Sequence, residues 1–130
     1  MQDNQPRLLV VDDEPANLRG MKQILQHDYH LIFAKNGAEA LRLTAEKKPN
    51  LILLDIMMPE MDGIEACEKI RKIKSLENVI ITFFTARGED YSQVAGFEAG
   101  ADDYITKPIK PKVLVSKVKS LLRRLKTETE

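Results

Sequence analysis

The feature that most constrains the fold of this chain is the alternation of short apolar runs with longer amphipathic segments. Three nearly continuous apolar runs, at residues 8–11, 51–54 and 79–84, are too short for buried helices and are bounded by polar or turn residues. Strands that are buried on both faces have this composition. Two weaker strands are predicted at residues 30–34 and 103–106.

The segments between these runs have the apolar spacing of helices. We predict helices around residues 18–25, 38–45, 64–73, 89–98 and 111–125. Five strand–helix repeats predict an α/β fold, a doubly wound parallel sheet with helices on both faces. Gly20 lies inside the first helix at a cost of about 1 kcal/mol relative to Ala. It indicates either close packing or a tolerated weakness.

Length and composition favour one small intracellular domain. A chain of 130 residues can bury a continuous core without disulfides. We expect a single domain over residues 1–130, with its core at about 7–124 and a polar tail or truncated linker at 125–130. The single cysteine, Cys67, excludes an internal disulfide and favours a reducing compartment. We therefore expect a cytoplasmic location.

The charge balance argues against two classes of partner. Lys plus Arg and Asp plus Glu each number 20, so the formal net charge is zero. No overall field would attract nucleic acid or anionic lipid. The chain also has neither a secretory signal pattern nor an apolar run near the roughly 20 residues that span a bilayer. We expect no direct nucleic acid binding and no membrane contact.

Reactive side chains follow four of the predicted strands. Asp12 and Asp13 follow the first strand, Asp55 the third, Thr85 the fourth, and Lys107 the fifth. In a doubly wound parallel sheet, ligands bind beyond the carboxyl ends of the strands. The sequence therefore predicts that acids, a hydroxyl and a cation meet at one edge.

This combination of groups suits phosphoryl transfer. Clustered carboxylates repel one another unless a hard divalent cation joins them, and oxygen ligands suit Mg²⁺. With the acids neutralised, Asp55 can act as a nucleophile toward phosphorus. Lys107 and the Thr85 hydroxyl would hold phosphoryl oxygens, and Ala86 leaves space for the incoming group.

The chain resembles the receiver domain of two-component response regulators, which have a CheY-like, flavodoxin-like fold. The resemblance covers essentially the whole chain. It rests on VVDDEP at 10–15, LLDIMMPEMDG at 53–63, TARGED at 85–90 and GADDYITKP at 100–108. It implies a five-stranded sheet in the order 2-1-3-4-5 and a phosphoacceptor at Asp55. It also implies a cis peptide bond between Lys107 and Pro108.

The resemblance also implies roles for individual residues. Mg²⁺, or Mn²⁺, would be bound by Asp13, Asp55 and the backbone carbonyl of Met57, with Asp12 assisting through metal-bound water. Thr85 would move toward the phosphoryl group and Tyr104 would turn inward behind it. This movement would remodel the face made by the fourth helix, fifth strand and fifth helix. Met57 and Arg87 would influence how quickly water removes the phosphoryl group.

Several conspicuous residues have simpler explanations. Glu14 is favoured by the helix dipole alone and is left out of the metal site. His27 and His30 are expected to face solvent rather than bind a ligand. Cys67 lies on the apolar side of a helix and is expected in the core. Composition alone would predict that Tyr104 is an aromatic residue of a strand that packs on its neighbours, and only the resemblance gives it a switching role.

The motifs most closely resemble receivers of winged-helix transcription factors, which dimerise through charged pairs on the same face. Such pairs could use Asp102, Asp103, Lys117 and Arg124. However, Val113 stands where those proteins usually carry an acid, and Gln93 and Ala95 stand where they often carry arginines. A homodimer through this face is therefore one option.

Two other functions are compatible with parts of the pattern. A flavodoxin-like cofactor module would need a loop of backbone donors for phosphate after the first strand, where this chain has Asp12-Asp13-Glu14. A haloacid-dehalogenase-type phosphatase would need a second acid two residues after its nucleophile, where Met57 cannot transfer a proton. A yellow flavoprotein, or rapid turnover of phosphomonoesters, would identify these alternatives.

The function we predict is a receiver that takes a phosphoryl group from a phosphohistidine of a sensor histidine kinase or histidine phosphotransfer protein. It would catalyse only its own modification and slow autodephosphorylation. Leu18 and Ile109 are predicted to contribute to kinase docking, as the family docks there.

Overall fold

Five parallel strands form one sheet in this computed structural model, which describes residues 5–76, 78–86 and 90–129. The strands are β1 (Arg7–Val11), β2 (His30–Ala34), β3 (Leu51–Leu54), β4 (Ile80–Thr85) and β5 (Asp103–Thr106). Their order is β2-β1-β3-β4-β5, as the resemblance implied. The sheet is therefore doubly wound, with the crossovers passing on both faces.

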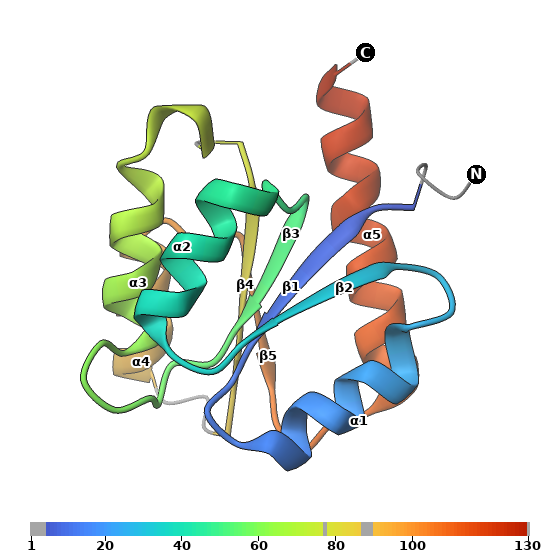
Figure 1. The fold of residues 1–130 in the computed structure, drawn as a ribbon, viewed down its shortest axis with the longest axis horizontal. Helices are drawn as coiled ribbons and strands as arrows, with labels where there is room; N and C mark the ends of the chain where they lie inside the picture. Colours follow the sequence, from blue (N-terminus) through green and yellow to red (C-terminus); the bar gives the residue numbers. More distant parts are fainter. Residues whose placement is uncertain (1–4, 77, 87–89, 130) are drawn as a thin grey trace.

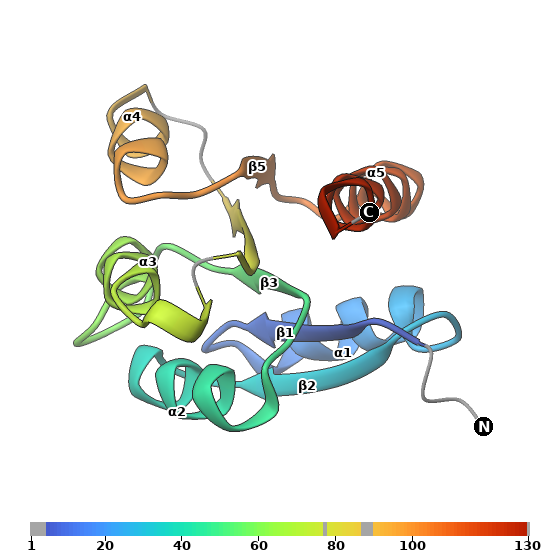
Figure 2. The same ribbon diagram turned by 90° about the horizontal axis from the view of Figure 1, so that it is seen from above.

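The helices form a layer on each face of the sheet. They are α1 (Pro15–Leu25), α2 (Gly37–Lys47), α3 (Gly63–Arg71), α4 (Asp90–Glu98) and α5 (Pro111–Thr129), with a 3₁₀ turn, η1, at Lys74–Leu76. Figure 1 shows the five strands crossing the centre of the molecule. Figure 2 shows α1 and α5 on one face and α2, α3 and α4 on the other.

The alternating side chains of the strands divide the core into two clusters. Leu9 and Val11 of β1 pack in the cluster under α2 and α3, whereas Leu8 and Val10 pack in the cluster under α1 and α5. All four are at most 1% exposed. Burial on both faces explains why the strands consist of continuous apolar runs.

Local signals explain where the helices begin. The side chain of Asn36 accepts a hydrogen bond from the Glu39 N–H at 2.8 Å, and Asp62 caps α3 in the same way at 2.9 Å. Pro15 starts α1, where the missing N–H costs nothing. These are ordinary N-cap arrangements.

Three of the differences from the prediction have a clear structural cause. The fourth strand runs from residue 80 to 85, one residue later than predicted, because Thr85 still pairs with Thr106. The last helix continues to Thr129, so most of the expected polar tail has a helical backbone. The turn η1 was not predicted, since three residues are too few to produce a periodic signal.

Gly20 marks close packing rather than a tolerated weakness. A Cβ at this position would lie 3.3 Å from Cδ1 of Ile109, so α1 closely approaches the loop after β5. Cys67 is buried as expected, and burial raises the pKa of its thiol to about 11. His27 and His30 are exposed, as expected. Within the described ranges no helix combines the length and hydrophobicity of a membrane span.

Candidate phosphoacceptor and metal site

The strand ends bring the predicted reactive residues to one edge of the sheet. Backbone hydrogen bonds extend the sheet ladder beyond the strands: Asp12 N–H donates to Ala34 O at 3.1 Å, Asp55 N–H to Val11 O at 3.0 Å, and Lys107 N–H to Thr85 O at 2.7 Å. Asp12, Asp55 and Lys107 are thus each held by the neighbouring strand. Their side chains begin from a rigid base, as a precise site requires.

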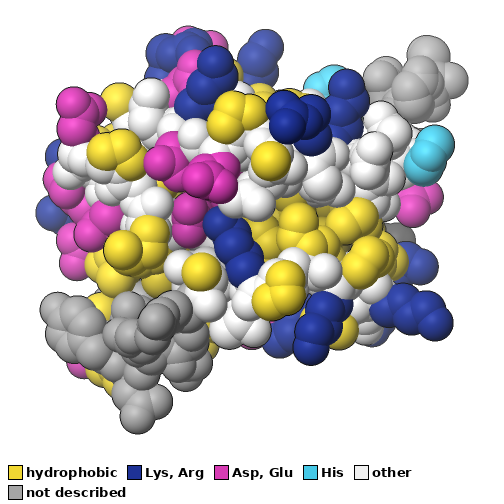
Figure 3. Space-filling model, turned by 90° about the horizontal axis from the view of Figure 1, so that it is seen from below, with side chains coloured by type: hydrophobic (Ala, Val, Ile, Leu, Met, Phe, Trp, Pro, Cys, Tyr) yellow, Lys and Arg dark blue, Asp and Glu magenta, His cyan; other side chains and the backbone are white. Residues whose placement is uncertain are grey.

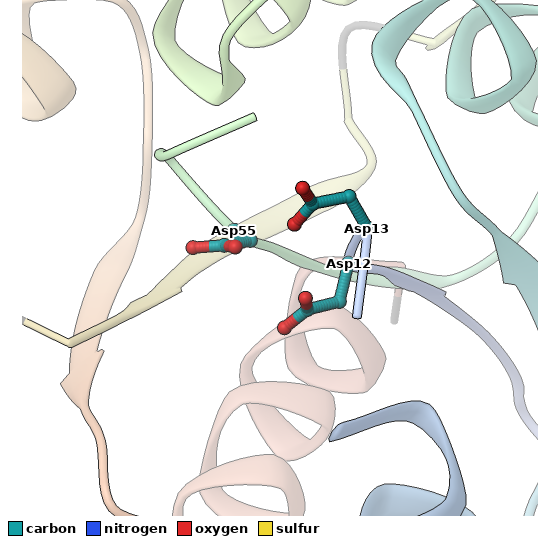
Figure 4. Close-up of side chains that lie close together, drawn as sticks. All are labelled: Asp12, Asp13 and Asp55. Carbon is teal, nitrogen blue, oxygen red and sulfur yellow. The ribbon is translucent and has the colours of Figure 1, made fainter. Parts of the chain in front are cut away.

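Three carboxylates converge at this edge. Figure 4 shows Asp12, Asp13 and Asp55 lying close together, with the carboxylates of Asp12 and Asp13 directed toward Asp55. One oxygen from each lies within 4.8 Å of the others. Asp12 and Asp55 are 1% and 4% exposed, whereas Asp13 is exposed. The site therefore has two buried acids and one that opens to solvent.

Lys107 is the cation of the site. Its Nζ lies 2.8 Å from Oδ2 of Asp12 and 3.5 Å from Oδ2 of Asp55. The ammonium also lies 5.2 Å from the centre of the Phe84 ring, within the range of a cation–π contact. The Lys107–Pro108 peptide bond is cis, which is the isomer that the resemblance implied.

The environment of Asp55 disfavours the charged carboxylate in the absence of a metal. Burial raises the pKa of Asp55 from 3.8 to about 6. Lys107 acts in the opposite direction, the Asp12 carboxylate raises the pKa further, and the Met57 N–H at 3.4 Å lowers it. One ammonium does not compensate for two buried carboxylates, so the site favours a further cation.

Asp12 is fixed by three donors, one of which the sequence analysis missed. Its Oδ1 accepts from the Glu14 N–H at 2.9 Å, and its Oδ2 accepts from Asn17 Nδ2 at 3.1 Å and from Lys107. Asn17 lies in the first turn of α1, where an amide side chain is also a common helix-start residue. Its position five residues after Asp12 was the only signal that could have identified it.

The loop after β3 passes very close to the start of α3. A Cβ on Gly63 would collide with the backbone oxygen of Asp55, and the Gly63 N–H donates to Ile56 O at 2.9 Å. Only glycine allows this approach. Gly63 therefore fixes the position of the backbone that carries Asp55.

The other predicted site residues differ in how far they are exposed to solvent. Thr85 is 2% exposed at the end of β4, Ala86 beside it is exposed, and Met57 is 72% exposed. Tyr104 lies behind the site on β5, where its ring contacts Phe83 edge to face with centroids 6.5 Å apart. Arg87 lies outside the described residues. Nothing is described of the Gln93 side chain.

The charged residues considered for dimer pairing already have partners within the chain. Asp102 Oδ2 lies 2.9 Å from Arg71 Nη2 and accepts the Ile81 N–H at 2.9 Å. Lys117 Nζ lies 3.2 Å from Asp103 Oδ2. Arg124 Nη2 reaches Asp102 Oδ1 at 4.0 Å. Among the residues whose side chains are described, α4 and α5 also expose Val94, Phe97 and Val113.

Leu18 and Ile109, the residues predicted to contribute to kinase docking, are both half-buried. Figure 3 looks onto this end of the molecule and shows a group of acidic side chains beside a hydrophobic area with basic residues around it. Among described residues, only Asp12, Asp13 and Asp55 form a group suited to a metal ion.

Comparisons with known proteins agree with this geometry. The family described as response regulator receiver domain matches residues 8–119. The transcriptional regulatory protein ResD of Bacillus subtilis is 46% identical over 124 residues, which cover 95% of this chain and 50% of ResD. This chain spans about half the length of the curated relatives it matches.

Solved structures give the same result. A CheY-like response regulator receiver domain protein from Methanospirillum hungatei has a TM-score of 0.90 at 34% identity, covering 96% of this chain and 99% of that one. A BeF3-activated DrrB receiver domain has a TM-score of 0.83 at 32% identity, covering 92% and 98%.

Proposed function

Because this chain belongs to the family of response regulator receiver domains of two-component systems, we propose that Asp55 accepts a phosphoryl group from a phosphohistidine. The donor is a sensor histidine kinase or a histidine phosphotransfer protein. The observation that carries the proposal is the buried Asp55 carboxylate beside Asp12, Asp13 and Lys107. Family membership also removes the flavodoxin-like and phosphatase alternatives.

The residues present fit a divalent metal ion. Three carboxylate oxygens lie within 4.8 Å of one another, and hard oxygen donors select Mg²⁺ or Mn²⁺ over softer metals. Asp12, Asp13 and Asp55 would hold the ion, together with the backbone carbonyl of Met57. A bound ion would neutralise the carboxylates and offset charge on the phosphoryl oxygens.

The reaction then follows from the positions of the side chains. An Asp55 oxygen attacks phosphorus as the P–N bond to the histidine breaks, and the imidazole keeps the bonding electrons. Lys107, which contacts both Asp12 and Asp55, needs only a small side-chain movement to pair with a phosphoryl oxygen. The Thr85 hydroxyl donates to another oxygen. Asn17 keeps Asp12 in place throughout.

The modified protein reverts by attack of water on the aspartyl phosphate. Asp12 is held by three donors, and Met57 beside Asp55 has no acid or base group. We therefore expect hydrolysis of the aspartyl phosphate to be slow. The domain therefore works as a switch that modifies itself rather than as an enzyme with turnover.

The output is a change in the face made by α4, β5 and α5. A recess of about 440 Å³ opens there and includes Phe97, Tyr104, Val113 and Lys117 in its lining. Movement of Thr85 toward the phosphoryl group makes room for Tyr104 to turn inward. The exposed Phe97 and Val113 favour a homodimer with a more apolar interface than charged pairs would make. We propose no nucleic acid contact by this domain and a cytoplasmic location.

Intact mass spectrometry with acetyl phosphate and Mg²⁺ tests the modification site. We expect a gain of about 80 Da, one phosphoryl group, that requires the metal. The variant Asp55→Asn should show no gain, and Asp28→Asn, at an exposed acid, should behave as the wild type. A gain of equal size in Asp55→Asn would disprove the assignment.

A second experiment addresses kinase docking. Replacing Leu18 and Ile109 with Asp should impair transfer from a cognate kinase while sparing phosphorylation by acetyl phosphate. Equal loss of both activities would argue against docking at these residues.

A further inference from the structure

The charged residues in α1 and in residues 111–124 of α5 are all basic. Residues 15–25 contain Arg19 and Lys22 and no acid. Residues 111–124 also contain no acid, and they have five basic residues: Lys112, Lys117, Lys119, Arg123 and Arg124. The two helices lie on the same face of the sheet (Figure 2). Since the whole chain has zero net charge, this face carries a local positive field.

A recess lies between the two helices. Its volume is about 560 Å³, and its lining consists of Ile24 from α1 and Pro111, Lys112, Val115, Ser116 and Lys119 from α5. Ile24 and Val115 are half-buried, whereas Lys112 and Lys119 are exposed. The recess thus combines apolar side chains with flanking ammonium groups.

The lysines of this recess are not neutralised within the described chain. Lys117 and Arg124 approach Asp103 and Asp102 at β5, away from the recess. Among the described residues, Lys112 and Lys119 take part in no ion pair. Seven residues separate them, which is two helical turns, so they lie on one stripe of α5 with Val115 and Ser116 between them.

We propose that this recess binds an acidic amphipathic helix of a partner protein. A groove between two helices receives apolar side chains spaced at i, i+3, i+4 and i+7. The stripe from Pro111 to Lys119 extends about 12 Å at 1.5 Å per residue, which matches about two turns of a bound helix. Carboxylates on either side of its apolar stripe would meet Lys112 and Lys119.

Two other anionic partners fit this surface less well. A bilayer needs protruding apolar side chains to insert, but Ile24 and Val115 are half-buried in the recess. Nucleic acid binding is dominated by phosphate contacts and gains little from apolar side chains between the lysines. The recess also does not include Leu18 or Ile109, so it is distinct from the kinase docking patch.

Fluorescence anisotropy with a designed peptide tests the proposal. The probe is a labelled helical peptide with leucines at i, i+3, i+4 and i+7 and glutamates on both sides. We expect saturable binding that weakens with salt. Charge reversal with Lys112→Glu and Lys119→Glu should weaken binding at least about tenfold, since it changes two close contacts. The matched control, Lys72→Glu with Lys74→Glu, should change binding less than about twofold.

Three results would overturn the proposal. One is an absence of saturable binding to the wild type. Another is equal weakening by the control pair, or equal binding of a scrambled peptide of the same composition, because either would show a non-specific charge effect. The third is that duplex DNA or phosphatidylserine vesicles bind as tightly as the peptide does and that this binding is lost in the same variants. All four substituted lysines are exposed, and urea unfolding would verify that each variant folds.

Discussion

The strongest quantitative prediction concerns the stability cost of ionising Asp55. The native pKa of about 6, against 3.8 for the ordinary carboxyl, arises first from burial. At 1.36 kcal/mol per pKa unit, this difference corresponds to about 3 kcal/mol of free energy of unfolding at pH 7.5. Asn has the same shape without the charge and still accepts a hydrogen bond from Met57 or Lys107. In metal-free buffer, Asp55→Asn should therefore be more stable than the wild type by about 2–3 kcal/mol.

The sign of the pH dependence follows from proton binding. Between pH 3.8 and about 6 the native Asp55 holds a proton that the unfolded chain has lost. The contribution of Asp55 to the free energy of unfolding therefore falls as the pH rises through this window. Below pH 3.8 the carboxyl is neutral in both states, and the gap between Asp55→Asn and the wild type should close.

Urea unfolding followed by circular dichroism measures this gap at pH 7.5 and at low pH, with a chelator present. Adding Mg²⁺ should stabilise the wild type more than the variant, because the metal binds the native carboxylates. Asp28→Asn, at an exposed position, should change neither value. An Asn variant that is no more stable than the wild type at pH 7.5, or a gap independent of pH, would refute the electrostatic argument.

Three other substitutions test the packing around the site. Thr82→Val should raise the free energy of unfolding by about 1 kcal/mol, because Thr82 Oγ1 is buried without a partner among the described residues. A lower free energy of unfolding in urea would show that the hydroxyl has a hydrogen-bond partner. Gly63→Ala should cost about 3 kcal/mol, because its Cβ meets the backbone of Asp55; an unchanged denaturation midpoint would contradict this contact. Asn17→Ala should lower stability by about 1 kcal/mol and slow acetyl phosphate labelling of Asp55, whereas labelling at the wild-type rate would show that Asp12 needs no amide donor.

Much of the fold was readable from local pattern. The runs at residues 51–54 and 30–34 became strands with the predicted limits. Residues 51–54 are buried throughout, as in a strand that is covered on both faces. Residues 30–34 form the partly exposed strand at the edge of the sheet. The placement of Asp12 and Asp55 at one edge follows from parallel strand direction alone. Two limits were predicted less accurately. The end of β4 depends on the pairing of Thr85 with Thr106, and the end of the last helix depends on how far the helix continues. A local sequence pattern contains neither.

The sequence by itself therefore determined which groups can meet. The acids, Thr85 and Lys107 lie at or just after the ends of strands, and periodicity together with strand direction places them at one edge. Only the tertiary structure decided how they meet. The hydrogen bond from Asn17 to Asp12 and the ion pair between Arg71 and Asp102 join residues of different elements. So does the basic recess between α1 and α5. The physical reason is that hydrophobic periodicity is a property of one segment, whereas a side-chain contact depends on which segments pack on the same face and at what distance.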